Sequence, residues 1–418
     1  MTRTAIVIGS GVVGLSVAAQ LRLDGFAVTV LDPRAPGEGC SAGNPGGISV
    51  SSVLPAAAPG VMRKVPGWLL DRDGPLSIRM THLPRLSPWL LRFLRAATPE
   101  RQRAGMVALY GLTRHAVTAW QALLAQTGAG DCLVPGGNLI VYRSRAQFEA
   151  ETASWDRRRA LGITVTDLPE GAVHALVPDL APAYGLARRV EDNARMVDPL
   201  ALCQRLAGWL EREGVRFVRH AADDVSIAND GRPDIRAGNE RLTADLAVLA
   251  AGAWSARLAR RLGDAIPLAP ERGYSVSWDA PGIALSTAVF SPSEKIMAAP
   301  VGGALRFAGT AEFAGFDAAP DWRRAESLAR LGRQMFPGLT SEPPTERWAG
   351  LRPSTPDGLP VLGRSKRSER VLYAFGHGHL GITTAAVTAR IIADLANGRP
   401  PASEAAPCAP GRFGRPPV

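Results

Sequence analysis

The first thirty residues alternate between apolar runs and small or polar breaks. Residues 4–8 (TAIVI) form a short apolar run that is typical of a buried parallel strand. Residues 15–23 carry apolar side chains at helical spacing, and Gly25 follows them as a helix stop. Residues 27–31 (AVTVL) form a second apolar run. The opening therefore predicts a strand, a helix and a second strand.

A glycine-rich turn with the spacing GxGxxG joins the first strand to the helix. Gly9 permits the tight turn, Gly11 lets the backbone approach a pyrophosphate, and Gly14 lets helix and strand pack closely. Asp32 closes the second strand, where its carboxylate can accept a hydrogen bond from a ribose hydroxyl. Because a helix N-terminus also favours phosphate, this unit predicts a bound dinucleotide.

A targeting segment is the alternative interpretation of the same residues. Residues 4–21 contain no charge and follow Arg3, as in a signal peptide or a membrane anchor. The glycines and Gln20 weaken this interpretation, and a strand with a terminal acid follows where a cleavage site would be expected. The dinucleotide site is therefore favoured.

The remaining chain alternates between helical and strand-like patterns. Predicted helices cover residues 89–97, 99–127, 146–161, 200–213, 322–335 and 382–395. Predicted strands cover residues 139–143, 215–218, 222–225, 242–251, 266–278, 288–307 and 371–374. Nucleotide-type strand–helix elements thus stand at both ends and in the middle, with helical and antiparallel segments between them.

This order predicts the fold class α/β with an α+β, two-domain organisation. A Rossmann-like nucleotide-binding domain is interrupted by an inserted substrate domain, which consists of an antiparallel sheet and helices. We assign residues 1–83, 160–258 and 346–400 to the discontinuous nucleotide domain, and 84–159 and 259–345 to the substrate domain. The Pro-rich tail, residues 401–418, is expected to be disordered or loosely packed.

Composition and charge narrow the possible partners. The 418 residues are 46% hydrophobic and 21% charged, as in a soluble globular protein, and no stretch predicts a membrane span. The net charge of +10 comes almost entirely from arginine, which favours genomic composition over nucleic acid binding, and no nucleic-acid motif is visible. Arg92, Arg95, Arg101 and Arg103 form either a solvated face or a contact to an anionic membrane.

The cysteines Cys40, Cys132, Cys203 and Cys408 are scattered, with no CxxC spacing. We therefore expect no disulfide framework, no metal and no iron–sulfur cluster held by this chain alone, and the default compartment is cytoplasmic. Residues 33–49 form a small-residue loop that either lies along the cofactor or is a mobile surface loop.

Four motifs together resemble the FAD-dependent amine and amino-acid oxidoreductases, the group of D-amino acid oxidase, glycine oxidase and sarcosine oxidase. They are GSGVVGLSVA with Asp32, AAGAWS at 250–255, GLRPSTPDGLPVLG at 350–363 and GHGHLGIT at 376–383. Within this group the chain resembles the small subunit, or single-chain form, of bacterial D-amino acid dehydrogenase, through GPLSIR at 74–79, residues 89–100, ERGYS at 271–275, SEKIMAAP at 293–300 and AEFAGFD at 311–317. The resemblance extends from residue 4 to about residue 398.

The resemblance implies that the dinucleotide is FAD, held non-covalently. Cysteine attachment, as in monomeric sarcosine oxidase, is not expected, because Cys408 in the tail is the only cysteine after Cys203. A helix N-terminus at residues 376–383 would stabilise the anionic reduced flavin. The cofactor contacts that the resemblance implies are Gly9, Gly11, Val12, Val13, Gly14, Asp32, Ser41, Asn44, Gly46, Gly47, Val225, Ala251, Gly252, Trp254, Gly350, Gly376, Gly378, His379, Leu380, Gly381, Ile382 and Thr383.

The resemblance also implies three substrate contacts. Arg352 matches the arginine that pairs with the substrate carboxylate, and Tyr274 places a hydroxyl near the substrate. His379 stands where glycine oxidases have arginine, and the GHGHLG form resembles relatives that act on D-proline and cis-4-hydroxy-D-proline. The alternatives are a surface arginine, a core tyrosine and a structural histidine.

The implied reaction is oxidation of a D-amino acid, with hydride transfer from Cα of the neutral amine to flavin N5, and no side chain is required as a base if the amine arrives deprotonated. The imine would hydrolyse to a 2-oxo acid, or remain a pyrroline when the substrate is cyclic. Electrons would pass to a quinone or another carrier, which suits a peripheral position on the cytoplasmic face of the inner membrane. The alternatives are an oxygen-dependent glycine or sarcosine type oxidase, a FAD-carrying subunit of a hetero-oligomer, and an NAD-binding protein.

Overall fold

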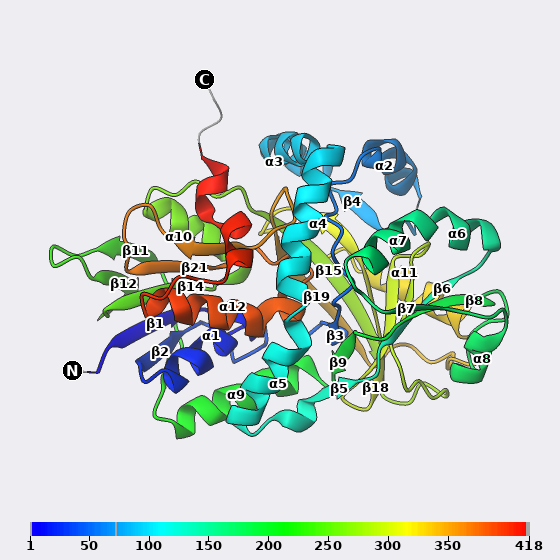
Figure 1. The fold of residues 1–418 in the computed structure, drawn as a ribbon, viewed down its shortest axis with the longest axis horizontal. Helices are drawn as coiled ribbons and strands as arrows, with labels where there is room; N and C mark the ends of the chain where they lie inside the picture. Colours follow the sequence, from blue (N-terminus) through cyan, green and yellow to red (C-terminus); the bar gives the residue numbers. More distant parts are fainter. Residues whose placement is uncertain (1, 72, 415–418) are drawn as a thin grey trace.

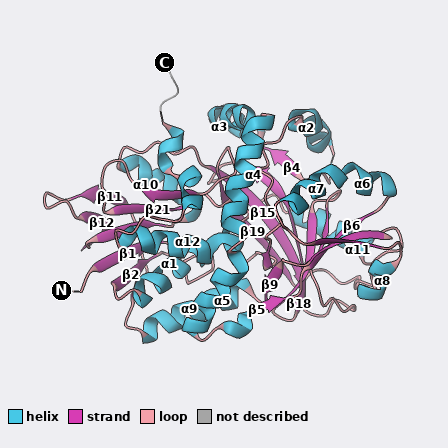
Figure 2. Ribbon diagram, viewed as in Figure 1, coloured by secondary structure: helices cyan, strands magenta, loops and turns pink. Residues whose placement is uncertain are grey.

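The computed structural model describes residues 2–71 and 73–414, and it contains two main sheets (Figures 1 and 2). The first sheet has six strands. Their order is β10 (Arg216–Val218), β2 (Ala27–Leu31), β1 (Thr4–Ile8), β14 (Leu246–Leu249), β21 (Val371–Phe375) and β20 (Val361–Arg364). Neighbouring strands are parallel except for the β20–β21 pair at one edge.

Both faces of this sheet are covered. Ala5 and Val7 of β1 belong to one core cluster, whereas Ile6 and Ile8 belong to another, because successive side chains point to opposite faces. The first face carries helices α1 (Val12–Leu23), α5 (Ala116–Thr127), α9 (Pro199–Arg212) and α12 (Gly381–Ala396). The second face carries α10 (Ser255–Arg261) and a small sheet of β11 (Asp224–Ile227), β12 (Pro233–Ala237) and β13 (Glu240–Thr243).

The second main sheet has nine strands and is mostly antiparallel. Its order is β19 (Glu346–Ser354), β15 (Ala269–Trp278), β18 (Ala304–Phe313), β17 (Ile296–Val301), β16 (Val289–Ser291), β6 (Asn138–Tyr142), β8 (Leu186–Val190) and β7 (Val165–Leu168), while β4 (Leu76–Ile78) pairs with β18. Helix α11 (Arg323–Met335) buries Ala325 and Leu328 against this sheet. The Rossmann-like domain with an antiparallel substrate domain, predicted from the sequence, is confirmed.

The remaining elements lie between and around the two sheets. The helices are α2 (Val61–Leu70), α3 (Leu83–Ala96), α4 (Pro99–Thr113), α6 (Arg145–Ala150), α7 (Thr152–Ala160) and α8 (Ala172–Leu176). A second small sheet has the order β3 (Gly47–Ile48), β9 (Ala194–Met196) and β5 (Leu133–Pro135). Among the residues that the structure describes, no helix is long and apolar enough to cross a bilayer.

Strand and helix contacts assign several segments to a different domain from the one predicted. Residues 346–354, predicted with the nucleotide domain, form β19 and pair with β15 in the large sheet. Residues 165–168 and 186–190 also join the large sheet, through the β6–β8–β7 pairing. Conversely, α5 lies within the segment 84–159 but packs on α1 and α12. Local patterns could not reveal these assignments, because they depend on which distant strand or helix each segment contacts.

The prediction of a disordered or loosely packed tail is wrong for residues 401–414. Two short 3₁₀ helices, Ser403–Cys408 and Pro410–Phe413, pack against the domain, and Cys408 is fully buried. Arg412 Nε lies 2.8 Å from Asp357 Oδ2, which attaches the segment to the loop before β20. Buried contacts therefore outweigh the proline-rich composition. The part of the predicted tail at residues 415–418 lies outside the described residues.

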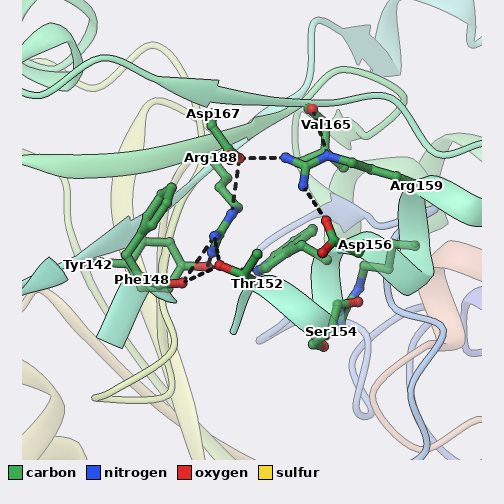
Figure 3. Close-up of polar contacts among 11 residues, drawn as sticks. Tyr142, Phe148, Thr152, Ser154, Asp156, Arg159, Val165, Asp167 and Arg188 are labelled. Atoms are coloured by element: carbon green, nitrogen blue, oxygen red, sulfur yellow. Dashed lines mark hydrogen bonds and ion pairs between the residues drawn. The ribbon is translucent and has the colours of Figure 1, made fainter. Parts of the chain in front are cut away.

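A fully buried arginine joins the strands and helices at one end of the large sheet (Figure 3). Arg188 on β8 donates to Asp167 Oδ1 at 3.1 Å and to the Tyr142 hydroxyl at 2.9 Å. It also donates to the Phe148 carbonyl at 3.0 Å and to Thr152 Oγ1 at 3.1 Å. Its guanidinium lies 3.7 Å from the centre of the Phe148 ring. Burial of this charge is thus compensated by hydrogen bonds and by the aromatic ring.

The Arg188→Met substitution is expected to lower the free energy of unfolding by about 3 kcal/mol, because it leaves several buried acceptors without a donor. Urea unfolding of the purified protein measures this loss. Arg189→Met is the matched control, since the neighbouring Arg189 is half-exposed and pairs with Glu191 on the surface. Its expected loss is below about 1 kcal/mol. Equal losses in the two variants would contradict the role assigned to Arg188.

Candidate active site

A cavity of about 1500 Å³ runs between the two main sheets. Its walls include the glycine turn after β1, the end of β2, the residues after β14 and the turn before α12. Strands β15, β18 and β19 of the large sheet line the opposite side, and α2 and α3 also contribute. The carboxyl ends of parallel strands thus face an antiparallel sheet across one space, which is where ligands bind in folds of this type.

The glycine turn is shaped by two close backbone contacts. A Cβ on Gly9 would lie 2.3 Å from the Ala250 carbonyl oxygen, and one on Gly14 would lie 2.0 Å from the Gly9 carbonyl oxygen. Gly9 also has φ +118°. A Cβ on Gly11, by contrast, would meet only Ser41 Oγ, at 3.5 Å. Gly11 therefore presents bare backbone to the cavity, whereas Gly9 and Gly14 are required by packing.

Polar groups at this turn are available to a bound phosphate or ribose. The Ser10 hydroxyl oxygen is buried and has no hydrogen-bond partner in the described structure. Asp32 accepts from the Ser10 N–H at 2.8 Å and from the Arg34 N–H at 2.9 Å, so both of its oxygens are fixed. A helix N-terminus with an unsatisfied buried hydroxyl and an oriented carboxylate fits the pyrophosphate–ribose part of a dinucleotide.

The loop of residues 33–49 is held on both sides. Arg306 of β18 donates to the carbonyls of Ala42, at 2.6 Å, and Asn44, at 3.1 Å. The Asn44 side chain accepts from the Gly46 N–H at 2.8 Å, while Thr383 Oγ1 accepts from the Ser49 N–H at 3.1 Å. These contacts favour the ordered-loop interpretation over the mobile one. Ser41, Asn44 and Gly47 line the cavity, as do most of the predicted cofactor residues.

The turn before α12 forms the opposite wall of the cofactor half. Gly376 and Gly378 have φ of +81° and +52°, and the Gly378 N–H donates to the Pro353 carbonyl at 2.9 Å. Residues 376–383 all line the cavity, including the first residues of α12. The positive end of a 16-residue helix therefore faces the cavity and would favour negative charge there.

The predicted substrate arginine lies in the cavity as part of an ion pair. Arg352 Nη1 donates to Glu271 Oε1 at 2.9 Å and to the Thr310 carbonyl at 3.1 Å. Ser354 Oγ donates to the other carboxylate oxygen of Glu271, at 2.7 Å. A Cβ on Gly273 would lie 2.3 Å from Arg352 Nη2, so glycine is required for the guanidinium to lie over β15.

His379 lines the same part of the cavity, and its side chain is exposed to the cavity interior. The surrounding protein lowers the pKa of His379, and the nearby Arg352 guanidinium lowers it further, while Glu271 acts in the opposite direction. The imidazole is therefore neutral at physiological pH. His377, two residues earlier, contacts Thr388 Oγ1 at 3.0 Å inside the domain, where burial lowers its pKa to about 3.

Tyr274 does not lie in the cavity. Its side chain is buried in the core of the large sheet, where the hydroxyl donates to Glu312 and accepts from the Asp321 N–H at 2.8 Å. Burial is also the main reason that its pKa is raised. The core-tyrosine alternative therefore describes this residue, because side chains alternate along β15 and Tyr274 points away from the face that carries the cavity.

Four predicted cofactor residues also lie outside the cavity lining: Gly14, Gly46, Val225 and Gly350. Val225 is buried in the core, and Ala222 and Asp223 line the cavity instead. A Cβ on Gly350 would lie 2.2 Å from the Trp348 ring, so this glycine makes room for an indole. Gly14 and Gly46 act through backbone packing. The motifs located the correct segments, but tertiary contacts decided which residues face the ligand.

Besides Ser10, the cavity residues Glu271 and Thr310 were not among the contacts predicted from the sequence. Glu271 stands beside the predicted Tyr274 in the ERGYS motif, but only the strand pairing shows that it faces Arg352. Thr310 has φ +58°, and its buried Oγ1 has no partner in the described structure. A strained backbone and an unsatisfied hydroxyl in a cavity mark functional positions. The sequence gives no signal for either property.

Comparisons with known proteins agree with this geometry. Residues 4–395 match the family described as DAO, FAD dependent oxidoreductase. A D-amino-acid oxidase of Bradyrhizobium diazoefficiens is 36% identical over 417 residues, covering 98% of this chain and 99% of the relative. D-amino acid dehydrogenase 2 of Ralstonia nicotianae is 35% identical over 430 residues, covering 97% and 99%.

Solved structures show the same fold. Glycine oxidase from Geobacillus kaustophilus superposes with a TM-score of 0.77 at 22% identity, covering 99% of this chain and 100% of that one. L-proline dehydrogenase from P. horikoshii gives a TM-score of 0.76 at 17% identity, covering 99% and 98%. The fold is therefore shared with proteins that differ widely in sequence.

The positions of the cysteines indicate whether one of them could bind a flavin covalently. Of the four cysteines, Cys40 lines the cavity, whereas Cys132, Cys203 and Cys408 are buried outside it. Burial raises the pKa of Cys40 to about 11, so the nucleophilic thiolate is scarce at neutral pH.

Acid precipitation of the flavin-loaded protein is therefore expected to release all of the flavin into the supernatant. Absorbance of the supernatant and of the redissolved pellet measures the two fractions. Flavin that stays with the pellet, and is released by Cys40→Ser, would contradict non-covalent binding.

Proposed function

The chain belongs to the family of FAD-dependent oxidoreductases, and on that premise we propose that it oxidises D-amino acids at Cα. The observation that carries the proposal is the position of Arg352, which lines the cavity beside the turn that begins α12. An arginine at this place can hold a substrate carboxylate in a fixed orientation. The curated relatives that align over nearly the whole chain are named for D-amino acid oxidation, which supports this substrate class.

The chain provides two groups of residues that would hold FAD. The Gly11 backbone, the Ser10 hydroxyl and the Asp32 carboxylate fit the pyrophosphate and the adenosine ribose. The N-terminus of α12, with Thr383 and the loop around Asn44, fits the flavin end. When bound, the flavin supplies the hydride acceptor, so that the substrate leaves as an imine or, from a cyclic substrate, as a pyrroline.

The protein residues contribute orientation and electrostatics. Arg352 binds the substrate carboxylate, while Thr310 O and Gly273 hold its guanidinium in place. The dipole of α12 stabilises the negative charge that accompanies the reaction. The neutral imidazole of His379 stands beside the same site and can accept a hydrogen bond from a secondary amine. We therefore infer a preference for cyclic substrates such as D-proline and cis-4-hydroxy-D-proline.

We infer that a quinone at a membrane surface reoxidises the enzyme. Helices α2 and α3 line the cavity with Met62, Trp68, Leu90 and Phe93. Their outer surfaces, with the segment between them, expose the large apolar side chains Met62, Leu69, Met80, Leu91 and Leu94. Arg92 and Arg95 are exposed on α3 among them. Apolar and basic side chains on adjacent helices suit an anionic bilayer.

Oxygen is the second candidate acceptor, because the Bradyrhizobium relative is named an oxidase. A further possibility is that the chain works only inside a hetero-oligomer. Bound flavin without reduction by any D-amino acid would favour a partner-dependent subunit.

Anaerobic addition of D-proline or cis-4-hydroxy-D-proline to the holoenzyme is expected to bleach the visible flavin band. Arg352→Met should lower kcat/KM by about a hundredfold, because two charge-assisted hydrogen bonds to the carboxylate are lost. The matched control is Arg347→Met, since Arg347 is on the same strand but exposed, with its guanidinium 5.6 Å from the Trp322 ring centre. Equal effects of the two variants would contradict the assignment of Arg352 to the substrate site.

His379→Asn should lower the ratio of kcat/KM for D-proline to kcat/KM for D-alanine. An unchanged ratio would reject the role of His379 in specificity.

The acceptor is identified by following reoxidation of substrate-reduced enzyme. A quinone carried in anionic vesicles should reoxidise it faster than dissolved oxygen does, with little peroxide formed. Leu91→Glu should slow the reaction with vesicle-borne quinone but not with a water-soluble quinone, because it places a negative charge on the apolar surface. Val107→Glu is the control, an exposed apolar position on α4. Peroxide formation equal to substrate consumption would assign the protein to the oxidases.

A further inference from the structure

The positive charge of the proposed substrate arginine is already compensated by a carboxylate in the ligand-free structure. Glu271 on β15 and Arg352 on β19 are direct cross-strand partners, and their charged groups lie 2.9 Å apart. The Arg352 and Glu271 side chains are 21% and 20% exposed, and both line the cavity. The site therefore presents a positive and a negative group side by side, with part of each open to a ligand.

An ion pair of this kind discriminates between classes of carboxylate. A ligand with only a negative charge gains from Arg352 but is repelled by Glu271, and the two effects largely cancel at similar distances. A zwitterion has its ammonium one carbon away from its carboxylate. It can therefore direct each of its charges to the opposite member of the pair.

The neighbouring titratable groups do not disturb this arrangement. Burial raises the pKa of the Cys40 thiol to about 11 and keeps it protonated, while the protein around the cavity lowers the pKa of His379 and keeps its imidazole neutral. Glu271 retains the Ser354 hydroxyl as a donor, and Arg352 retains the Thr310 carbonyl as an acceptor. Each member of the pair thus has a second hydrogen-bond partner that does not depend on the other member.

We propose that Glu271 is a substrate-binding residue that holds the ammonium group of the amino acid as it binds, before that group releases its proton to water and reacts as the neutral amine, so that the Glu271–Arg352 pair selects zwitterions over simple carboxylate anions. This inference rests on the proposed function and adds a recognition element to it. The alternative is that Glu271 only positions Arg352. The two roles differ in one respect: loss of a positioning residue weakens all carboxylates alike, whereas loss of an ammonium site should weaken zwitterions and strengthen monoanions.

The test uses the holoenzyme and two ligands of similar shape. D-Proline is a zwitterion, and pyrrole-2-carboxylate is a planar monoanion that cannot be oxidised at Cα. Glu271→Gln should raise the KM for D-proline about tenfold and lower the inhibition constant of pyrrole-2-carboxylate several-fold, because one negative charge is removed beside Arg352. Glu271→Asp retains the charge and should retain the wild-type order of the two ligands.

Glu170→Gln is the charge control, because Glu170 pairs with Arg145 on the surface and has no contact with the cavity. It should leave both constants unchanged. Parallel weakening of both ligands by Glu271→Gln would show that Glu271 only positions Arg352. An unchanged KM for D-proline together with an unchanged inhibition constant of pyrrole-2-carboxylate would also overturn the proposal.

Failure of the proposed function gives a different result. If D-proline does not reduce the wild-type flavin, D-proline becomes an unreactive ligand. Its dissociation constant and that of pyrrole-2-carboxylate can then be measured from the perturbation of the flavin spectrum. Opposite shifts in Glu271→Gln would support zwitterion recognition without D-amino acid oxidation, whereas absence of D-proline binding to the wild type would overturn both.

Discussion

The antiparallel pairing of β15 with β19 is the constraint on which the site depends. This pairing places Glu271 opposite Arg352 and Gly273 opposite Gly350. At the end of β19, Ser354 forms a bridge with His377, which brings the large sheet against the turn before α12. A one-residue slip of either strand would turn its charged group to the other face of the sheet, away from its partner. The register therefore decides whether the substrate groups and the cofactor turn share one cavity.

Glycines in this region serve packing between segments far apart in the chain. Trp348 occupies the space left by Gly43 and Gly350, so the loop after β2 can approach β19. The same strand pair accommodates the Arg352 guanidinium over Gly273. Bulky or charged side chains thus fill positions that glycine leaves open, and the resulting walls are held by several contacts rather than one. This arrangement fixes the site before any ligand binds.

The large sheet contains two kinds of charged group, which differ in their exposure to the cavity. Arg188 and the Arg272–Glu312 pair are buried and satisfied by neighbouring groups, which makes them part of the architecture. The Glu271–Arg352 pair is partly open to the cavity and keeps bonding capacity for a ligand. Exposure to the cavity, more than the strength of the pairing, separates the functional ion pair from the structural ones.

The sequence by itself determined the elements that local physics controls. Apolar periodicity predicted β1, α1, β2, α11 and α12, and the spacing of Gly9, Gly11 and Gly14 predicted the phosphate turn, because these features depend on neighbours in the chain. The resemblance of its motifs also predicted the family and the flavin. Only the tertiary structure decided that Glu271 faces Arg352, that Tyr274 is in the core and that β19 belongs to the large sheet. Those outcomes depend on strand register and on contacts between distant segments, which no local pattern encodes.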